Sequence, residues 1–230
     1  TTLAFVSLME NGERDFYFNR GADGQLSIDE IKEIGKENFS IIHFGSATGF
    51  LPGPLQTAYL GLLNQVAGTK TFISFDPNYR HLLFQDNLSS FIEQSWEFLN
   101  QCHFFKLSDE EAMLLTKTKT LDDAAFQLKE RTEGVFAITL GKDGTYLRHG
   151  THSMIIPSIP VNPVDTTGAG DAFVGAVLFQ LSRLEQASMH SLSVDEWQKI
   201  VVNANKAGAR TCEYLGAMEA FKHLSKQIFQ

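Results

Sequence analysis

Apolar and polar residues follow two patterns along this chain, one typical of β-strands and the other of amphipathic helices. Short apolar runs between turn residues predict strands over residues 3–8, 15–18, 40–44, 71–75, 102–107, 135–140, 145–148 and 153–159. Apolar residues that recur every three or four positions predict helices over residues 54–67, 88–99, 108–116, 121–131, 171–184, 194–214 and 219–228. Most strands after residue 40 are followed by a helix, an order that indicates a mostly parallel α/β layer fold.

The beginning of the chain has a different pattern. The two β-like runs before residue 20 flank Asn11-Gly12, a dipeptide typical of tight hairpin turns. Two further helix starts are marked by capping boxes, in which a serine is followed three residues later by a glutamate: Ser27 with Glu30, and Ser193 with Glu196. We therefore expect one continuous domain, with residues 1–25 as a small β-flap and residues 26–230 as the α/β core.

Residues 164–173, Val-Asp-Thr-Thr-Gly-Ala-Gly-Asp-Ala-Phe, carry the clearest chemical signal. The small residues Gly168, Ala169 and Gly170 precede a helix whose apolar positions are Phe173, Val177 and Leu181, together with Ala172, Ala176 and Phe179. Backbone N–H groups at a helix start have no intrahelical partner, and the helix dipole is positive there, so this run predicts an anion site. Asp171 in the first turn adds a proton acceptor, and the combination suggests transfer of a phosphoryl group to a hydroxyl.

The run resembles D-T-x-G-A-G-D, the signature of PfkB-type (ribokinase-family) carbohydrate kinases. The resemblance implies a ribokinase-like three-layer α/β/α sandwich with a mostly parallel central sheet and a small β-flap, or lid, at the N-terminal end. It implies that Asp171 is the catalytic base and that Gly168, Ala169 and Gly170 form the anion hole. By comparison with the family, roughly the first third of the domain is missing, so we interpret the sequence as an N-terminally incomplete kinase domain over residues 1–230.

Two further segments resemble the family's ATP site. Residues 139–144 resemble its T-L-G-x-x-G nucleotide loop, which assigns Thr139, Gly141 and Gly144 to ATP, although a plain hairpin turn is an alternative. Residues 203–210 resemble the segment that lines the adenine pocket, with Asn205 as the candidate for contact with the base. The same resemblance assigns Lys106 to ATP.

Cation sites follow from the resemblance as well. Residues 106–111 fall where the family carries N-x-x-E, which implies that Glu111 positions Mg²⁺ through water, while Ser108 replaces the asparagine. A capping box formed by Ser108 and Glu111 is an alternative explanation for the same residues. The resemblance also implies a K⁺ ion beside the anion hole, in contact with Asp165 and Thr167.

The acceptor side is indicated by two segments. Residues 72–80 resemble the family's F-D-x-N-x-R run at the C-terminal end of a central strand, where α/β sheets bind ligands, and this implies that Asn78 and Arg80 lie near the sugar or the transferring phosphate. Local turn bonds made by Asp76 and Asn78 are the alternative. The flap segment resembles that of fructokinases, which implies that Phe18 and Arg20 bind substrate; a plain surface hairpin is the alternative.

The resemblance therefore predicts ATP-dependent phosphorylation of a sugar primary hydroxyl, most similar to a bacterial fructokinase that converts D-fructose to fructose 6-phosphate. A kinase for 2-keto-3-deoxygluconate or a related keto sugar acid is an alternative, and a non-catalytic regulatory or structural protein is a second. The expected cofactors are ATP and Mg²⁺, with K⁺ in addition. The sequence contains no G-x-x-x-x-G-K-[ST] loop, which disfavours a P-loop ATPase.

Composition narrows the partners and the compartment. The net charge of −8 makes nucleic acid an unexpected partner, and there is no apolar run near the roughly 18 residues that a membrane span needs. The two cysteines, Cys102 and Cys212, lie in apolar segments and are expected to be buried free thiols, which suits a reducing, cytoplasmic compartment. The resemblance also implies a homodimer formed through the lid strands.

Overall fold

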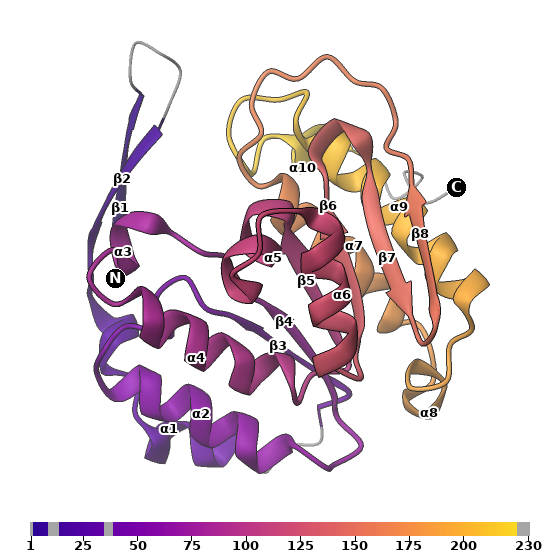
Figure 1. The fold of residues 1–230 in the computed structure, drawn as a ribbon. Coiled ribbons are helices and arrows are strands. Elements are labelled where there is room, and N and C mark those ends of the chain that lie inside the picture. Colours follow the sequence, from indigo (N-terminus) through magenta and orange to yellow (C-terminus); the bar gives the residue numbers. More distant parts are fainter. Residues whose placement is uncertain (1, 9–13, 35–38, 225–230) are drawn as a thin grey trace.

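The computed structural model describes residues 2–8, 14–34 and 39–224 and is built on a six-stranded sheet of order β3-β4-β5-β6-β7-β8 (Figure 1). Four neighbouring strands are parallel: β3 (Ile41–Gly45), β4 (Phe72–Asp76), β5 (Phe104–Ser108) and β6 (Val135–Thr139). An antiparallel hairpin of β7 (Thr145–His149) and β8 (His152–Ile156) extends the sheet beyond β6. The expectation of a mostly parallel sheet is therefore confirmed.

Helices cover both faces of this sheet. One face packs against α2 (Pro54–Val66), α4 (Leu88–Leu99), α5 (Asp109–Thr116) and α6 (Leu121–Arg131). The other face packs against α7 (Ala169–Leu181) and α9 (Val194–Thr211). Successive strand residues point to opposite faces, so Phe104 joins the second core whereas its neighbour Phe105 joins the first. The three-layer arrangement expected from the sequence is confirmed.

The N-terminal strands form a separate antiparallel pair, β1 (Leu3–Leu8) with β2 (Arg14–Asn19). Figure 1 shows this ribbon projecting from the core beside α3 (His81–Phe84). The expected Asn11-Gly12 turn lies outside the described residues. Short elements complete the chain: the 3₁₀ turns Ala22–Gln25 and Gly141–Asp143, and the helices α1 (Ile28–Ile34), α8 (Gln186–Met189) and α10 (Ala220–His223). Among the described helices, none combines the length and apolarity needed to cross a membrane.

Helix starts follow the capping signals in the sequence. Ser193 and Glu196 form the complete reciprocal box at the start of α9. At the start of α1, the Glu30 carboxylate accepts the Ser27 N–H at 2.7 Å. The side-chain oxygens satisfy N–H groups that the helix cannot pair, so these starts could be located from local sequence alone.

Several boundaries differ from the expectation. Strand β8 ends at Ile156 rather than 159, where Pro157 lacks the N–H needed to continue the ladder. Helix α7 begins at Ala169 and ends at Leu181 rather than 184, and its Phe179 is 47% exposed. Helix α9 ends at Thr211 rather than 214. Of the expected final helix, the described residues contain only α10.

Candidate active site

The carboxyl ends of the four parallel strands form one edge of the sheet. Gly45 pairs with Asp76 at the ends of β3 and β4, and Ser108 pairs with Thr139 at the ends of β5 and β6. A cavity of about 490 Å³ lies at this edge, between the strand ends and the start of α7. The predicted site residues that line it are Asn78, Arg80, Lys106, Glu111, Thr167, Gly168, Gly170 and Asp171. The fold thus brings much of the predicted acceptor side and the anion site to one place.

The start of α7 supplies backbone donors to this cavity. Gly168 is its N-cap, with φ of 82° in the left-handed region. Ala169 donates its N–H to Thr166 O at 3.2 Å, and Ala169 does not line the cavity. Within the described part of the chain, the N–H groups of Gly168, Gly170 and Asp171 donate to no protein acceptor. The prediction for Ala169 therefore needs correction: its N–H is held in the turn, and the unpaired donors are those of its neighbours.

The loop before α7 is anchored by Asp165. One carboxylate oxygen of Asp165 accepts the Thr167 N–H at 2.8 Å, and the other accepts the Gly216 N–H at 2.8 Å. A Cβ on Gly168 would lie 2.8 Å from that of Ala217, so the loop after α9 packs directly on the glycine turn. Asp165 is only 7% exposed, and its oxygens are hard ligands suited to a cation such as K⁺. The residues present fit the predicted cation, whose binding stays a prediction.

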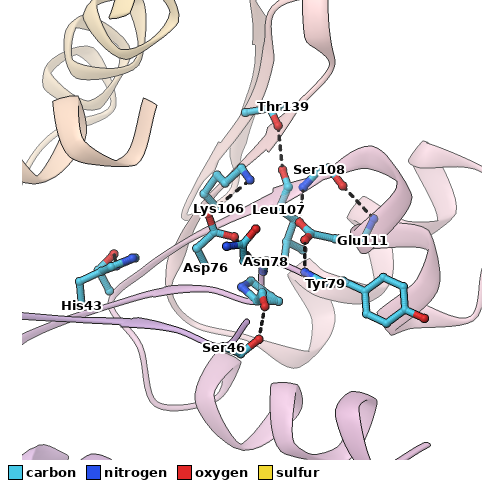
Figure 2. Close-up of polar contacts among 12 residues, drawn as sticks. His43, Ser46, Asp76, Asn78, Tyr79, Lys106, Leu107, Ser108, Glu111 and Thr139 are labelled. Atoms are coloured by element: carbon cyan, nitrogen blue, oxygen red, sulfur yellow. Dashed lines mark hydrogen bonds and ion pairs between the residues drawn. The ribbon is translucent and has the colours of Figure 1, made fainter. Parts of the chain in front are cut away.

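A buried ion pair lies under the start of α7. Lys106 Nζ is 3.4 Å from Asp76 Oδ2, and the two side chains are 8% and 6% exposed (Figure 2). A Cβ built on Gly170 would lie 3.1 Å from the same Nζ, so the absence of a side chain at residue 170 lets the ammonium approach the helix start. The pair places one positive charge beside the unpaired N–H groups.

The charges around this pair explain its titration. Burial raises the pKa of Asp76 to about 6; Lys106 opposes the rise and Glu111 adds to it. Burial alone would lower the pKa of Lys106, but the carboxylates of Asp76, Glu111 and Asp171 outweigh burial and raise it. The Asp76 pKa thus rises mainly because the carboxyl group is buried, whereas the Lys106 pKa rises because three carboxylates surround the ammonium. At pH 7 we take both groups as charged.

The turn after β4 forms the opposite wall. Asp76 Oδ1 accepts the Asn78 N–H at 3.1 Å, and Asn78 has φ of 48°. Arg80 donates to Tyr79 O at 3.0 Å while lining the cavity. The local-turn explanation for Asp76 is thus confirmed, and the structure adds the contact with Lys106 to it. Asn78 and Arg80 lie where an acceptor could meet Asp171, and their binding role stays a prediction.

Glu111 is held by backbone donors on both oxygens. Its Oε2 accepts the Ser108 N–H at 2.8 Å, and its Oε1 accepts the Tyr79 N–H at 2.7 Å. Ser108 Oγ accepts the Glu111 N–H at 3.1 Å, which completes the capping box. The capping explanation is confirmed. Glu111 lines the cavity and each of its oxygens can accept a further hydrogen bond, so the side chain fits the predicted water-mediated contact with Mg²⁺.

Of the residues assigned to ATP, Lys106 lines this cavity, whereas Thr139, Gly141, Gly144 and Asn205 do not. Thr139 Oγ1 donates to Leu107 O at 3.3 Å, and residues 140–144 form the turn between β6 and β7, with φ of 57° at Gly141. A Cβ on Gly144 would lie 2.1 Å from Ile156 O. The alternative of a hairpin turn is confirmed, and close packing on β8 by itself requires glycine at residue 144. Nucleotide contact by this turn stays a prediction.

Asn205 has a different environment from the one expected. Its amide donates to Ile156 O at 3.0 Å and to Pro157 O at 3.3 Å, and it accepts from Thr145 Oγ1 at 2.6 Å. Both N–H donors are therefore used, and the residue is 6% exposed. Asn205 therefore ties α9 to β7 and to the end of β8, and its contact with the base stays a prediction.

The lid residues are oriented toward the core loops. Arg20 donates to Pro52 O at 3.1 Å and to Thr48 O at 3.4 Å, and its Nε lies 3.7 Å from Asp23 Oδ2. Arg20 therefore joins the end of β2 to the loop after β3 and does not line the cavity, and its binding of substrate stays a prediction. The backbone of Phe18 lies in β2; its side chain is outside the described part of the structure.

Comparison with known proteins decides the family. The profile of the pfkB family carbohydrate kinases matches residues 1–223. This chain belongs to the PfkB family of carbohydrate kinases. Its fold is ribokinase-like: it resembles the crystal structure of a Vibrio cholerae O395 fructokinase double mutant in its fructose, ADP and potassium ion bound form, with a TM-score of 0.80, 25% identity, and coverage of 96% of this chain and 69% of that one.

Other members of the family are similar over the same range. "Probable fructokinase-3" of Arabidopsis thaliana is 33% identical over 228 residues, which cover 96% of this chain and 63% of that protein. The aminoimidazole riboside kinase of Salmonella enterica, solved with aminoimidazole riboside and an ATP analog, is 28% identical with a TM-score of 0.78, covering 93% of this chain and 69% of that one. The PfkB chain thus spans about two thirds of the length of these relatives.

The site at this edge of the sheet also contains residues that sequence reasoning missed. Tyr79 and Thr166 line the cavity, and Asp76 contacts Lys106 as well as its own turn. His43 on β3 bonds Ser74 Oγ at 3.2 Å, and its electrostatic contact with Asp171 places it near this edge (Figure 2). Their position in the sequence could have indicated them, because Asp76 ends a strand and His43 lies two residues before the end of another. The other prediction about reactive groups is confirmed: Cys102 and Cys212 are free and buried.

Proposed function

We propose that this PfkB-family protein transfers the γ-phosphoryl group of ATP to a primary hydroxyl of a sugar, with D-fructose as acceptor and fructose 6-phosphate as product. The observation that carries the proposal is one cavity that joins Asp171, the unpaired N–H groups at the start of α7, and the Lys106 ammonium. Phosphoryl transfer requires positioning and charge neutralisation more than covalent chemistry, and these groups supply both.

In the proposed reaction, Asp171 accepts the proton of the sugar hydroxyl as the hydroxyl oxygen attacks the γ-phosphorus. The bond between that phosphorus and the β–γ bridging oxygen breaks, and ADP leaves with the bonding electrons. The N–H groups of Gly168 and Gly170, with Lys106 beside them, stabilise the negative charge on the transferring group. Asn78 and Arg80 orient the acceptor from the opposite wall. The turn containing Thr139, Gly141 and Gly144 binds the nucleotide, and Asn205 maintains that region by holding α9 to β7 and β8.

Two cations complete the proposal. Glu111 would hold Mg²⁺ through water, and Asp165 with Thr167 would hold K⁺. When bound, these ions would neutralise phosphate charge and support the glycine turn. The fructokinase relative with bound ADP and potassium ion supports the choice of nucleotide and monovalent ion.

The acceptor is proposed from similarity to fructokinases, with the lid strand carrying Phe18 closing over the sugar. A coupled assay of the natural protein that contains these residues, with fructose, 2-keto-3-deoxygluconate and ribose, tests it. We expect the highest kcat/KM with fructose. A preference for the keto sugar acid would replace the acceptor, and no turnover with any sugar, despite ATP binding, would favour a non-catalytic role.

Asp171→Asn tests the proposed base. The isosteric amide cannot accept the proton as a carboxylate does, so we expect turnover to be lost while ATP affinity stays within about threefold, because the backbone donors remain. Asp122→Asn is the matched control, since Asp122 is an exposed acid in the first turn of α6, away from the cavity. Wild-type turnover in Asp171→Asn would refute the assignment.

We also propose a homodimer through the lid strands. Phe5 and Tyr17 are cross-strand partners, exposed by 56% and 71%, and Leu3 on the same face is 50% exposed. Light scattering of the wild-type protein and of Tyr17→Lys checks this: we expect a dimer that dissociates in the variant. A monomeric wild-type protein would refute the proposal.

A further inference from the structure

Asp76 connects the two sides of the proposed kinase site. Its Oδ1 accepts the N–H of Asn78, in the turn that forms the acceptor wall, at 3.1 Å. Its Oδ2 lies 3.4 Å from the Nζ of Lys106, which approaches the start of α7. Figure 2 shows the Asp76 carboxylate lying between the Asn78 turn and the Lys106 ammonium. One buried carboxylate at the end of β4 therefore contacts the Asn78 turn directly and reaches the start of α7 through Lys106.

Lys106 needs such a partner because of where its charge lies. The residue is 6% exposed, and a helix start is positive, so an ammonium at this position gains nothing from the dipole. A lysine side chain also has much rotamer freedom to lose when it is held in one place. A carboxylate beneath the ammonium offsets both costs. Among the described residues, Asp76 is the ion-pair partner of Lys106 within 4 Å.

The contact is loose enough to leave Lys106 available. Charge-assisted N–H···O bonds are usually about 2.7–2.9 Å long, shorter than the 3.4 Å seen between these side chains. An ammonium has three donors, and this contact occupies one of them. The Nζ itself would lie 3.1 Å from a Cβ on Gly170, and this is where the transferring phosphoryl group would be held.

Stability alone gives a weak reason for such a pair. Removing two charges from water costs free energy that their mutual attraction often does not offset. Apolar residues of similar size at such positions frequently stabilise a fold as much as the ion pair does. The pair at the end of β4 sits at the ligand-binding edge of the sheet, under the anion site.

We propose that Asp76 is a positioning residue that presents the Lys106 ammonium to the transferring phosphoryl group and keeps the Asn78 turn aligned with it. This inference rests on the proposed phosphoryl transfer. It predicts that Asp76 acts on the reaction through Lys106, so the effects of the two residues are not independent.

A double-mutant cycle tests the dependence. Lys106→Met should lower kcat by about 10²-fold to 10³-fold, the loss typical of one transition-state donor. Asp76→Asn keeps an oxygen for the Asn78 N–H but loses the charge under Lys106; we expect kcat to fall about tenfold or more, with KM for the sugar within about threefold. In the Lys106→Met background, Asp76→Asn should have little further effect.

Two further variants separate positioning from folding. Asp76→Glu restores the charge and should recover part of the lost kcat. Ser95→Ala is the matched control, because Ser95 is also a fully buried polar residue but its hydroxyl bonds Phe91 O within α4 and does not line the cavity. We expect this control to lose stability but keep kcat. Equal losses from Asp76→Asn in both backgrounds, or wild-type kcat in Asp76→Asn, would overturn the inference.

Nucleotide binding distinguishes failure of this inference from failure of the proposed function. Calorimetric titration with ADP and with a non-hydrolysable ATP analogue measures how much the γ-phosphate adds to affinity. We expect both Asp76→Asn and Lys106→Met to reduce the ratio of the affinity for the ATP analogue to the affinity for ADP, even if the wild-type protein phosphorylates none of the sugars tested. An unchanged ratio in both variants, with sugar turnover intact in the wild type, would refute the inference alone. Loss of all nucleotide binding in the wild type would refute both.

Discussion

Gly170→Ala adds one methyl group at the point where Lys106 meets the start of α7. The added Cβ would lie 3.1 Å from Lys106 Nζ and 3.7 Å from Lys106 Cε, and no other contact within 4 Å is formed outside the helix itself. The methyl group therefore meets only the flexible end of one side chain. Lys106 can withdraw by a few tenths of an ångström, but the ammonium then leaves the phosphate position.

Two effects of Gly170→Ala on the free energy of unfolding nearly cancel. Alanine is favoured over glycine in a helix by about 0.5–1 kcal/mol, and a displaced lysine side chain costs about 0.5–1.5 kcal/mol. We therefore expect the free energy of unfolding to change by about 1 kcal/mol or less. Catalysis is more sensitive, because a misplacement of about 1 Å in a reacting group can cost about 10²-fold, so a smaller shift should lower kcat about tenfold.

Gly175→Ala is the matched control on the same helix. A Cβ on Gly175 meets nothing within 4 Å, so this variant gains the helix propensity without moving Lys106. We expect it to be more stable by about 0.5–1 kcal/mol, with unchanged kcat. Urea unfolding and the coupled kinase assay measure the two quantities in both variants. Equal kcat in Gly170→Ala and Gly175→Ala would refute the importance of Lys106 at the anion site; a loss of stability above about 2 kcal/mol would refute the contact argument.

Three further changes have distinct expected outcomes. Gly168→Ala should destabilise the fold by about 2 kcal/mol or more in urea unfolding, because φ is 82° and the loop after α9 leaves no room for a Cβ; a neutral effect would contradict this packing. Asn205→Leu should cost about 2–4 kcal/mol through loss of its three buried hydrogen bonds and should weaken ATP binding; full stability would contradict its role as a tie between α9 and the sheet. Burial, and secondarily His190, lowers the pKa of His103, and its Nδ1 accepts the Ile73 N–H at 2.9 Å. The neutral ring therefore stabilises the fold fully above the unfolded pKa of about 6.5, and this stabilisation is lost as the pH falls below that value. His103→Asn keeps an acceptor for the Ile73 N–H but cannot titrate in this range, so the urea midpoint should change less between pH 7.5 and pH 5.5 than in the wild type. An unchanged pH dependence of the midpoint would show that other groups cause it.

Local sequence predicted the elements well where one physical signal dominates. Apolar runs located β3 to β8, and serine–glutamate boxes located the starts of α5 and α9. Short elements such as α3 and α8 were missed, since four residues cannot show a helical period. Phe179 is one of the apolar positions that predicted α7, yet it is 47% exposed, because whether a helix face is covered depends on neighbouring elements that periodicity does not specify.

The sequence alone determined the chemistry at the start of α7, because a glycine turn, a helix start and Asp171 are adjacent in the chain and their geometry is local. Tertiary structure decided what surrounds it. Lys106 and Asp76 lie 30 residues apart in sequence and meet only because β4 and β5 are neighbouring parallel strands that end at the same edge. Tertiary packing likewise decided that Asn205 bonds the sheet and that Arg20 bonds a core loop, since a polar side chain's partners depend on which segments pack beside it.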